Sequence, residues 1–451
     1  MIGSIRTYHR RFQAGQASPR DVIEECIQRI EDRNPELNAF VSTNWKLARE
    51  EADRASERYR TGLDRGLLDG IPVGLKDLFN TRGMATTAAS KILLNHVPSE
   101  DAPVVTTLHE RGANTFLGKL NLHEFAFSPT GTSSYFGPMK NPHDSTRMAG
   151  GSSGGSGIAV ATGMVAAALG TDTGGSVRIP AAFCGSYGLK PTYDRLNRDG
   201  VLPLSWTLDH VGIMADSLDN LLVMSRGMGI GEPSRDWGAP FELKGQRVLW
   251  LQDSQWDQID QGVQKAMRGA IQRLVTLGVE VIPTDLPRGG EIRASQQVIL
   301  GAEAANYHWA WLQSRPQDYQ PDVLERLTTR SSYLAIHYIE ALRRRQELIE
   351  FYRQSVFHDV AFVVSPTVPI RPPKLEVDEV AGMDVRQVLT VWTAPFNLLG
   401  LPAMTLPMGR PEDGIGVQVV VPWGHEDRLL QIAALMDDSG GGHKSSVRPS
   451  C

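Results

Sequence analysis

From residue 66 onward the sequence alternates short apolar runs with glycines, and this pattern limits what the chain can fold into. Such runs, bounded by glycine or proline, are typical of strands buried on both faces in α/β proteins. The runs lie in both halves of the chain: "GIPVGLKD" (70–77), "ANTFLGKL" (113–120), "MVAAALGTD" (164–172), "VGIMAD" (211–216), "VAFVVSPTVPI" (360–370), "PAMTLPMG" (402–409) and "GVQVVVP" (416–422). Because the runs at both ends are alike, we expect them to form one sheet within one large α/β domain.

Polar segments with helical periodicity surround these runs. In "SPRDVIEECIQRIEDRNPELNAF" (18–40) apolar residues recur at helical spacing after a Ser-Pro cap, and 45–60 continues as a charged helix. The chain therefore divides into five parts: 1–65, a helical segment packed on the core; 66–230, the core; 231–355, a variable helical region; 356–436, the remainder of the same core sheet; and 437–451, a flexible tail.

Charge and cysteine content narrow the function classes. The 451 residues include 46 basic and 51 acidic residues, a net charge of -5, which argues against nucleic acid as a partner. Cys26, Cys184 and Cys451 form no CxxC motif, which indicates a reducing compartment without a disulfide framework. The chain has neither an apolar signal segment at its N-terminus nor a run of about 18 apolar residues. We expect a cytoplasmic protein with a small-molecule substrate and no membrane contact.

The stretch "AGGSSGGSG" (149–157) permits four interpretations: a flexible linker, a phosphate-binding loop, a serine nucleophile on a turn, or close packing of a helix. A linker fits poorly, because a small-residue apolar run that must be buried follows at once. A phosphate-binding loop lacks its Gly-Lys-Ser/Thr. The stretch matches G-x-S-x-G around Ser152 and Ser153, although this match is weak in a Gly/Ser run. On this stretch alone, glycines that allow close helix packing are favoured.

A second stretch, "LGTDTGGSVRIP" (169–180), predicts a strand, a Gly-Gly turn and a short helix with Pro180 in its first turns. Ser176 then lies on the strand-to-helix turn, where successive backbone N–H groups can converge on a developing negative charge. The alternative is a glycine turn with a capping serine, in which Asp172 and Arg178 only pair with each other.

A third stretch, "LDGIPVGLKDLFN" (68–80), places Lys76 at the end of an apolar run. Burial lowers the pKa of a lysine, and a neutral amine can act as a base. The alternative is a lysine that reaches solvent or pairs with Asp77. No cluster of His, Cys, Asp or Glu has the spacing of metal ligands, so we expect no metal.

Taken together, the three stretches resemble the amidase signature family. Lys76 in "PVGLKD" precedes "GGSSGGS" and "GTDTGGSVRIPAAFCGSYGLKPT", with Ser152 and Ser176 24 residues apart. The pieces "LGKLNLHEFAF", "DHVGIMADS" and "NLLGLPAMTLPMG" extend the resemblance from about residue 18 to about 435. The resemblance implies a single large domain with a mixed central β-sheet covered by helices on both faces, in a monomer or homodimer. It also implies that the core 66–230 holds the catalytic residues and that the variable region 231–355 covers the substrate pocket.

The resemblance also implies roles for individual residues. Ser176 resembles the nucleophile, Lys76 the base, and Ser152 the bridging serine on a cis peptide bond. The backbone N–H groups of Thr173, Gly174, Gly175 and Ser176 resemble the oxyanion hole, and Ser153, Asp172 and Arg178 match supporting positions. No metal or organic cofactor is implied.

The family includes both stand-alone amidases and the glutamine-dependent component of tRNA amidotransferases. That component carries an acidic residue shortly before its PxNLxGxP element, whereas "VLTVWTAPFNLLGLP" has none between Gln387 and Pro395. We expect Thr390, Trp392 and Phe396 to form an apolar pocket wall, and Tyr333, Ile336 and Tyr338 to lie near a substrate entrance unless they only pack between helices. The prediction is a stand-alone serine hydrolase of small amides, aryl amides, esters or carbamates, with a glutamine amidotransferase component of a tRNA-dependent complex as the alternative.

Overall fold

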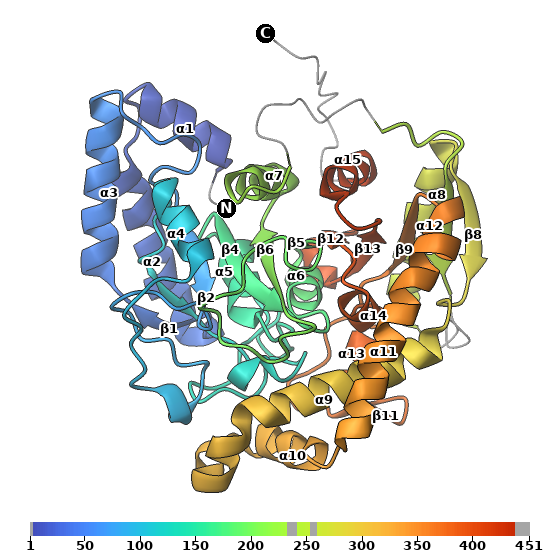
Figure 1. Ribbon diagram of the computed structural model, residues 1–451. Helices are drawn as coiled ribbons and strands as arrows, with labels where there is room; N and C mark the ends of the chain where they lie inside the picture. The colour runs from blue at the N-terminus through green and yellow to red at the C-terminus, as the bar shows by residue number, and fades with distance from the viewer. Residues whose placement is uncertain (1–2, 232–240, 253–258, 438–451) are drawn as a thin grey trace.

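The sheet joins strands from both ends of the chain, as the sequence predicts. The computed structural model describes residues 3–231, 241–252 and 259–437, in which one mixed sheet runs through the centre of the molecule (Figure 1). The expected flexible tail lies outside these residues except for Asp437. The α/β fold with a mixed sheet between helical layers is therefore confirmed.

Within the described residues the sheet has 11 strands. Parallel pairs join β2 to β3 and β4, and join β7 to β8 and β9, while the other neighbours are antiparallel. In spatial order the strands are β1 (Phe40–Thr43), β3 (Gly118–Leu120), β2 (Val73–Lys76), β4 (Ala167–Asp172), β6 (His210–Ala215), β5 (Tyr187–Lys190), β12 (Ala403–Pro407), β13 (Gly416–Val420), β9 (Phe362–Pro366), β7 (Arg247–Leu251) and β8 (Glu280–Thr284). A separate hairpin pairs β10 (Glu379–Val380) with β11 (Met383–Asp384).

Helices cover both faces of this sheet. α5 and α6 pack against the central strands on one face, and α7, α15 and α8 pack on the other (Figure 1). The α-helices are α1 (Ile5–Gln13), α2 (Pro19–Leu37), α3 (Trp45–Arg60), α4 (Pro103–Glu110), α5 (Gly154–Ala161), α6 (Arg178–Cys184), α7 (Leu218–Gly227), α8 (Gln261–Thr276), α9 (Gly289–Ser314), α10 (Pro321–Arg330), α11 (Ala335–Phe351), α12 (Phe357–Asp359), α13 (Val385–Thr390), α14 (Ala394–Leu398) and α15 (Glu426–Met436).

The region 231–355 is not purely helical, in contrast to the prediction. It also contributes β7 and β8, which lie side by side at one edge of the sheet. β8 has no fully buried residue, so it lacks the continuous apolar run that marks the central strands. An edge strand of this kind leaves little signal in a sequence.

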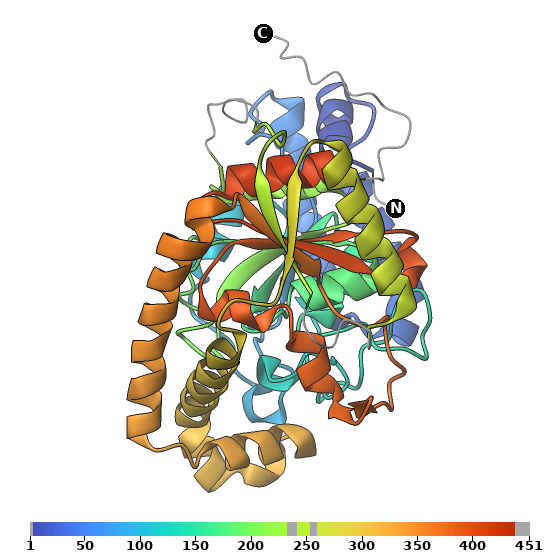
Figure 2. The same cartoon turned by 90° about the vertical axis from the view of Figure 1, so that its right-hand side faces the viewer.

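The long helices α9 and α11 extend away from the sheet and carry α10 at their far end (Figures 1 and 2). Glu303 of α9 joins this arm to the core and to α11. It accepts hydrogen bonds from Ser205 Oγ (2.6 Å), from the Thr207 amide (3.0 Å) and from the Tyr338 hydroxyl (2.8 Å). These hydrogen bonds hold α9 and α11 near the C-terminal ends of β2 and β4.

None of the helices in the described ranges is long and apolar enough to cross a membrane.

Candidate active site

Two parallel strands bring the predicted lysine to the predicted serine loop. β2 and β4 pair in parallel with Leu75 opposite Leu169, so both strands end at the same edge of the sheet. Lys76, the last residue of β2, is fully buried. Its Nζ lies 2.7 Å from Ser152 Oγ and 2.8 Å from Thr171 Oγ1. The alternative in which Lys76 reaches solvent is therefore wrong.

The stretch 149–157 is a tightly packed turn that continues into α5. A Cβ atom at Gly155 would lie 2.5 Å from the carbonyl oxygens of Ala39 and Asn121, so only glycine fits at this position. The linker interpretation is therefore wrong, and the close helix packing is confirmed. This packing also fixes where the two serines of the turn lie.

Ser152 and Ser153 connect the turn to β4 and to Ser176. The peptide bond between Gly151 and Ser152 is cis, as the family resemblance implies. Ser153 Oγ donates to the carbonyl oxygen of Thr171 (3.1 Å), and the Ser153 amide donates to the carbonyl oxygen of Ser176 (3.1 Å). The two serine-bearing turns thus lie side by side.

Ser176 lies between β4 and α6, on the predicted strand-to-helix turn. It is 6% exposed and lines a cavity of about 270 Å³ together with Thr173 and Gly174. Pro180 is the third residue of α6, where its missing N–H costs no helical hydrogen bond. A small ligand in this cavity can therefore reach the Ser176 hydroxyl.

The four predicted backbone donors are not equivalent. The Gly175 amide donates to Asp172 Oδ1 (2.8 Å), so it is not available to a ligand. The Thr173, Gly174 and Ser176 amides donate to no acceptor within the described part of the chain. The expectation for Gly175 therefore needs correction, because the carboxylate that shapes the turn occupies its N–H group.

A buried ion pair between Asp172 and Arg178 shapes this turn. All five N–H groups of the Arg178 guanidinium are used, and both side chains are fully buried. The guanidinium donates to both carboxylate oxygens of Asp172 (2.8 and 3.0 Å), to Thr393 O (3.0 Å), to Gln418 Oε1 (2.6 Å) and to Asn397 Oδ1 (2.7 Å). Burial alone would raise the pKa of Asp172, but Arg178 lowers it below its usual range.

Burial of Lys76 lowers its pKa and so favours the neutral amine. Burial lowers the pKa of Lys76 to about 7, against the opposing effect of the Asp209 and Asp172 carboxylates. An unperturbed lysine is neutral less than ~0.1% of the time at pH 7. Burial also raises the pKa of Asp209 to about 6, although Thr173 Oγ1 donates to this carboxylate (2.6 Å).

Three arginines surround the outer part of the cavity that Ser176 lines, which we call the arginine cavity: Arg326 and Arg330 of α10, and Arg386 of α13. Arg386 donates to both oxygens of Asp384 (2.6 and 2.9 Å), which neutralises its charge. Arg326 lies over the Phe127 ring (4.5 Å), and its Nη1 is buried without a hydrogen-bond partner in the described chain. Arg326 thus keeps one donor that no described residue uses, although this Nη1 atom has almost no solvent-accessible surface.

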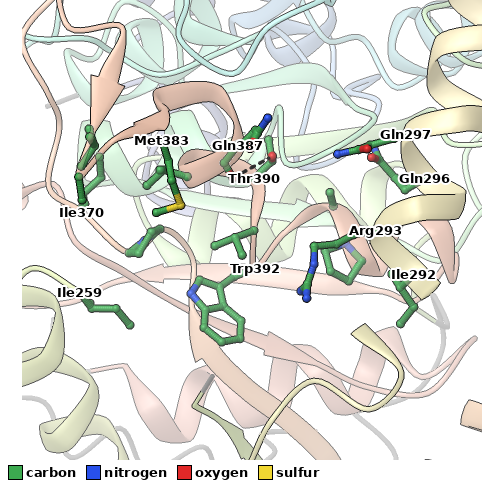
Figure 3. Close-up of a pocket in the computed structure, with 17 residues that line it drawn as sticks. Ile259, Ile292, Arg293, Gln296, Gln297, Ile370, Met383, Gln387, Thr390 and Trp392 are labelled. Carbon is green, nitrogen blue, oxygen red and sulfur yellow. Dashed lines mark hydrogen bonds between the residues drawn. The ribbon is translucent and has the colours of Figure 1, made fainter. Parts of the chain in front are cut away.

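The predicted pocket residues divide into two groups. Thr390 lines the arginine cavity and a neighbouring cavity, and Trp392 lines the neighbouring one (Figure 3). Phe396 is fully buried in the core and lines neither cavity. Tyr333 packs beside Gly301 of α9, and Ile336 is 66% exposed, so neither lines these cavities. The apolar wall thus includes Thr390 and Trp392 but not Phe396.

Sequence reasoning missed Thr171, Asp209 and Arg326. Thr171 lies in the stretch "GTDTGGS", but strand alternation does not predict its contact with Lys76. Alternation places Thr171 on the face of Leu169 and of the paired Leu75, and Lys76 on the other face. Asp209 is the first residue of "DHVGIMADS", a piece that carries the family resemblance, but nothing in that piece predicts its position near Lys76. Arg326 comes from a helical segment without a motif, and only the fold brings it near the site. In the described ranges, no three His, Cys, Asp or Glu side chains are grouped so that they could hold a metal ion.

Comparison with known proteins places this geometry in one family. The family model described as Amidase matches residues 21–430. The chain belongs to the amidase family. Its members are amidohydrolases, enzymes that cleave C–N bonds, so the family resemblance seen in the sequence is confirmed.

Three relatives show the range of the family. The chain is 32% identical to a glutamyl-tRNA(Gln) amidotransferase component from Bdellovibrio bacteriovorus, over 93% of each chain. The chain is also similar to a solved structure of a vestigial protein complex that reveals the evolutionary origins of an s-triazine catabolic enzyme. The two chains are 32% identical and superpose with a TM-score of 0.89, over 97% of this chain and 99% of the other. A peptide amidase in complex with the competitive inhibitor chymostatin is 26% identical to this chain. The TM-score is 0.81, over 96% of this chain and 97% of the peptide amidase.

Replacing Arg178 with methionine should destabilise the protein strongly. The Asp172 charge would stay buried without its partner, a change that typically costs about 3–5 kcal/mol. Arg410→Met is the matched control, because Arg410 pairs with Asp413 (3.1 Å) at the surface and is 72% exposed. Urea unfolding followed by tryptophan fluorescence should show a large drop in midpoint for Arg178→Met and almost none for Arg410→Met. Equal shifts would contradict the central role of the buried pair.

Proposed function

We propose that this protein hydrolyses the C–N bond of small amides through an acyl-enzyme on Ser176. The observation that supports this most is the buried Lys76 amine 2.7 Å from Ser152 Oγ, next to the cavity that Ser176 lines. Related acyl chemistry would extend to aryl amides, esters and carbamates, because each presents a carbonyl carbon with a leaving group.

The first step is attack by the Ser176 oxygen on the substrate carbonyl carbon. A serine hydroxyl is a poor nucleophile unless a neighbour takes its proton. In the proposed relay the Ser176 proton passes to Ser152 Oγ while the Ser152 proton passes to the lone pair of Lys76 Nζ. Lys76 must be neutral at the start, which its lowered pKa favours.

The tetrahedral intermediate places a negative charge on the former carbonyl oxygen. The Gly174 and Ser176 amides are the proposed donors to it, because neither has another acceptor in the described chain. Asp172 holds the Gly175 and Val177 amides (2.8 and 3.1 Å) and so fixes the turn before substrate arrives. Preorganised donors of this kind need no rearrangement during the reaction.

Collapse of the intermediate breaks the C–N bond. The Lys76 ammonium returns its proton through Ser152 to the leaving nitrogen, which departs as an amine and leaves an ester on Ser176. Water then attacks the ester carbon, and its proton passes through Ser152 to Lys76 before Ser176 is released with a hydrogen on its oxygen. The protonation step matters most for amides, since an unprotonated amine is a poor leaving group.

The arginine cavity favours a substrate that carries a carboxylate. Arg326 and Arg330 line this cavity, and a carboxylate oxygen is the acceptor that a guanidinium binds best. Arg326 Nη1 has no partner in the described chain, and a small shift of this buried group would bring it to a bound carboxylate. Desolvation and the nearby Arg330 and Arg386 lower the pKa of Arg326, as expected for a cation that lacks a counter-ion. We propose an anionic amide as the preferred substrate.

The alternative is a glutamine-hydrolysing component of a tRNA-dependent amidotransferase complex. The likeness to the amidotransferase component of Bdellovibrio bacteriovorus favours it. The wall from Gln387 to Pro395 has no acidic residue to bind the glutamine ammonium group. Of the acids that line the arginine cavity, Asp384 is paired with Arg386, and Glu325 is exposed. We therefore favour a stand-alone amidase.

Hydrolysis of a substrate panel by the wild type and Ser176→Ala tests the proposal. The panel holds glutamine, an aliphatic amide, an anilide, an aryl ester and an aryl carbamate. We expect turnover of the amides without any partner protein and a loss of at least ~1000-fold in Ser176→Ala, because the acyl-enzyme cannot form. Release of ammonia, amine or phenol is measured, according to the substrate, and Ser225→Ala, a buried serine outside the site, is the control. Turnover of glutamine alone, or only after a partner is added, would favour the amidotransferase alternative.

The pH profile should report the Lys76 amine. Because the neutral amine is the active form, kcat/KM should rise with pH and level off above about pH 7. The Asp209 carboxylate stabilises the ammonium form, so Asp209→Asn should lower the pKa of Lys76 and move the rise to lower pH. The exposed Glu36→Gln is the control. If kcat/KM rose at the same pH in Asp209→Asn as in the wild type, Asp209 would have no effect on the pKa of Lys76, in contradiction to this prediction.

The role of Arg326 is tested with two four-carbon amides, succinamate and butyramide. Succinamate ends in a carboxylate where butyramide ends in a methyl group. Arg326→Gln should lower kcat/KM for succinamate about 10- to 100-fold, since a hydrogen bond to a charged group is lost. Butyramide should change less than about threefold. Arg343→Gln, on the exposed face of α11, is the control. An equal loss for both substrates would mean that Arg326 supports the cavity wall and does not bind a carboxylate.

A further inference from the structure

A second cavity of about 310 Å³ shares lining residues with the arginine cavity, and Figure 3 shows the side chains that line it. We call it the tryptophan cavity. Most of its lining residues are apolar, and they come mainly from α9, the segment after β9, the β10–β11 hairpin, α13 and the segment that follows it. They include Ile292, Ile370, Val380, Met383, Val388 and Trp392. The volume is at the lower end of the roughly 300–1,000 Å³ of small-molecule sites.

The two cavities meet beside the proposed oxyanion donors. Four residues line both of them: Gln296, Gln297, Gln387 and Thr390. A Cβ atom built on Gly174 would lie 3.8 Å from Ala394 Cβ and 4.0 Å from Thr390 Cγ2. Gly174 therefore lies beside residues of both cavities, so a substrate carbonyl bound there would be close to both.

The chemistry of the two cavities differs. The arginine cavity presents Arg326 and Arg330, whereas Arg293, the cation that lines the tryptophan cavity, is exposed to solvent. Trp392 is 2% exposed, and its backbone carbonyl accepts from Gln418 Nε2 (2.9 Å), which holds this wall to the core. Apolar walls that are fixed before binding favour an apolar ligand group.

We propose that the tryptophan cavity is a second substrate subsite, which binds an alkyl or aryl group across the scissile bond from the group in the arginine cavity. The inference rests on the proposed amidase function and adds to it the substrate class. The substrate is an amphiphilic amide, with its anionic end toward α10 and its apolar end toward Trp392. Small unsubstituted amides would fill only half of the site.

Two series of substrates test the proposal and its orientation. The first is N-alkylsuccinamates, from unsubstituted to hexyl, with the carboxylate on the acyl side. The second is N-acylglycines, from acetyl to octanoyl, with the carboxylate on the amine side. In one series kcat/KM should rise about threefold for each added methylene until the cavity is full. The series that rises tells which side of the amide the cavity binds.

A large side chain that fills the tryptophan cavity should remove the dependence of kcat/KM on the length of the substrate chain. Val380→Trp places a large ring at the hairpin wall, away from Ser176. We expect kcat/KM for the longest substrate to fall at least ~10-fold, and that for the unsubstituted one to change less than about twofold. Glu379→Trp is the matched control, because Glu379 precedes Val380 in β10, is exposed and lines neither cavity. Thermal unfolding of both variants checks that they fold.

The wild-type series decides the matter even if a variant is unstable. Hydrolysis that depends on Ser176 but not on chain length in either series would overturn the subsite and leave the proposed function standing. Equal losses for short and long substrates in Val380→Trp would also overturn it. Absence of Ser176-dependent hydrolysis with every substrate would overturn the proposed function, and this inference with it.

Discussion

The buried pair of Asp172 and Arg178 is the interaction on which the rest of the site depends. Asp172 ends β4, and its carboxylate holds the amides of the following turn, so the backbone around Ser176 has one conformation. Arg178 begins α6 and donates to groups from α14, β13 and the segment between α13 and α14. Two charges buried side by side are stable only when every hydrogen bond is made, and here all five guanidinium donors are used. The geometry of the turn is therefore set by the whole sheet.

In the same region, burial and two carboxylates act in opposite directions on the pKa of Lys76. No carboxylate of the described residues contacts the buried Lys76 amine directly, but Asp209 and Asp172 are close enough to raise its pKa. Burial favours the neutral amine, and the carboxylates favour the ammonium form. The outcome is a pKa near neutrality, as the proposed relay requires of a group that both accepts and returns a proton. Neither a solvent-exposed lysine nor one paired directly with Asp77 would have this property.

The fold could be predicted from the sequence because its signals are local: the runs that form β2, β4 and β13 are continuous and apolar. The centre of the candidate site could not be predicted from any one stretch, because each of the three stretches alone also fits a structural role. Only their combination, through the family resemblance, points to Lys76, Ser152 and Ser176. β8 could not be predicted, since an edge strand with no fully buried residue has no such run. Asp209 begins a stretch that carries the resemblance and Arg326 lies in a helix without a motif, and only the folded chain shows where either side chain lies. Phe396 and Ile336 show the reverse error: an aromatic or aliphatic residue near a motif can lie in the core or at the surface instead of in a pocket.

The strand order also determines when the site can exist. β5 and β12 are neighbours in the sheet, although more than 200 residues separate them in the chain. A chain emerging from the ribosome holds Lys76, Ser152 and Ser176 long before it holds β12 and β13. Until then β5 is an open edge, and Arg178 lacks Thr393, Asn397 and Gln418. An unfinished chain thus carries the reactive side chains without the frame that orients them, and the sheet must be completed before any chemistry begins.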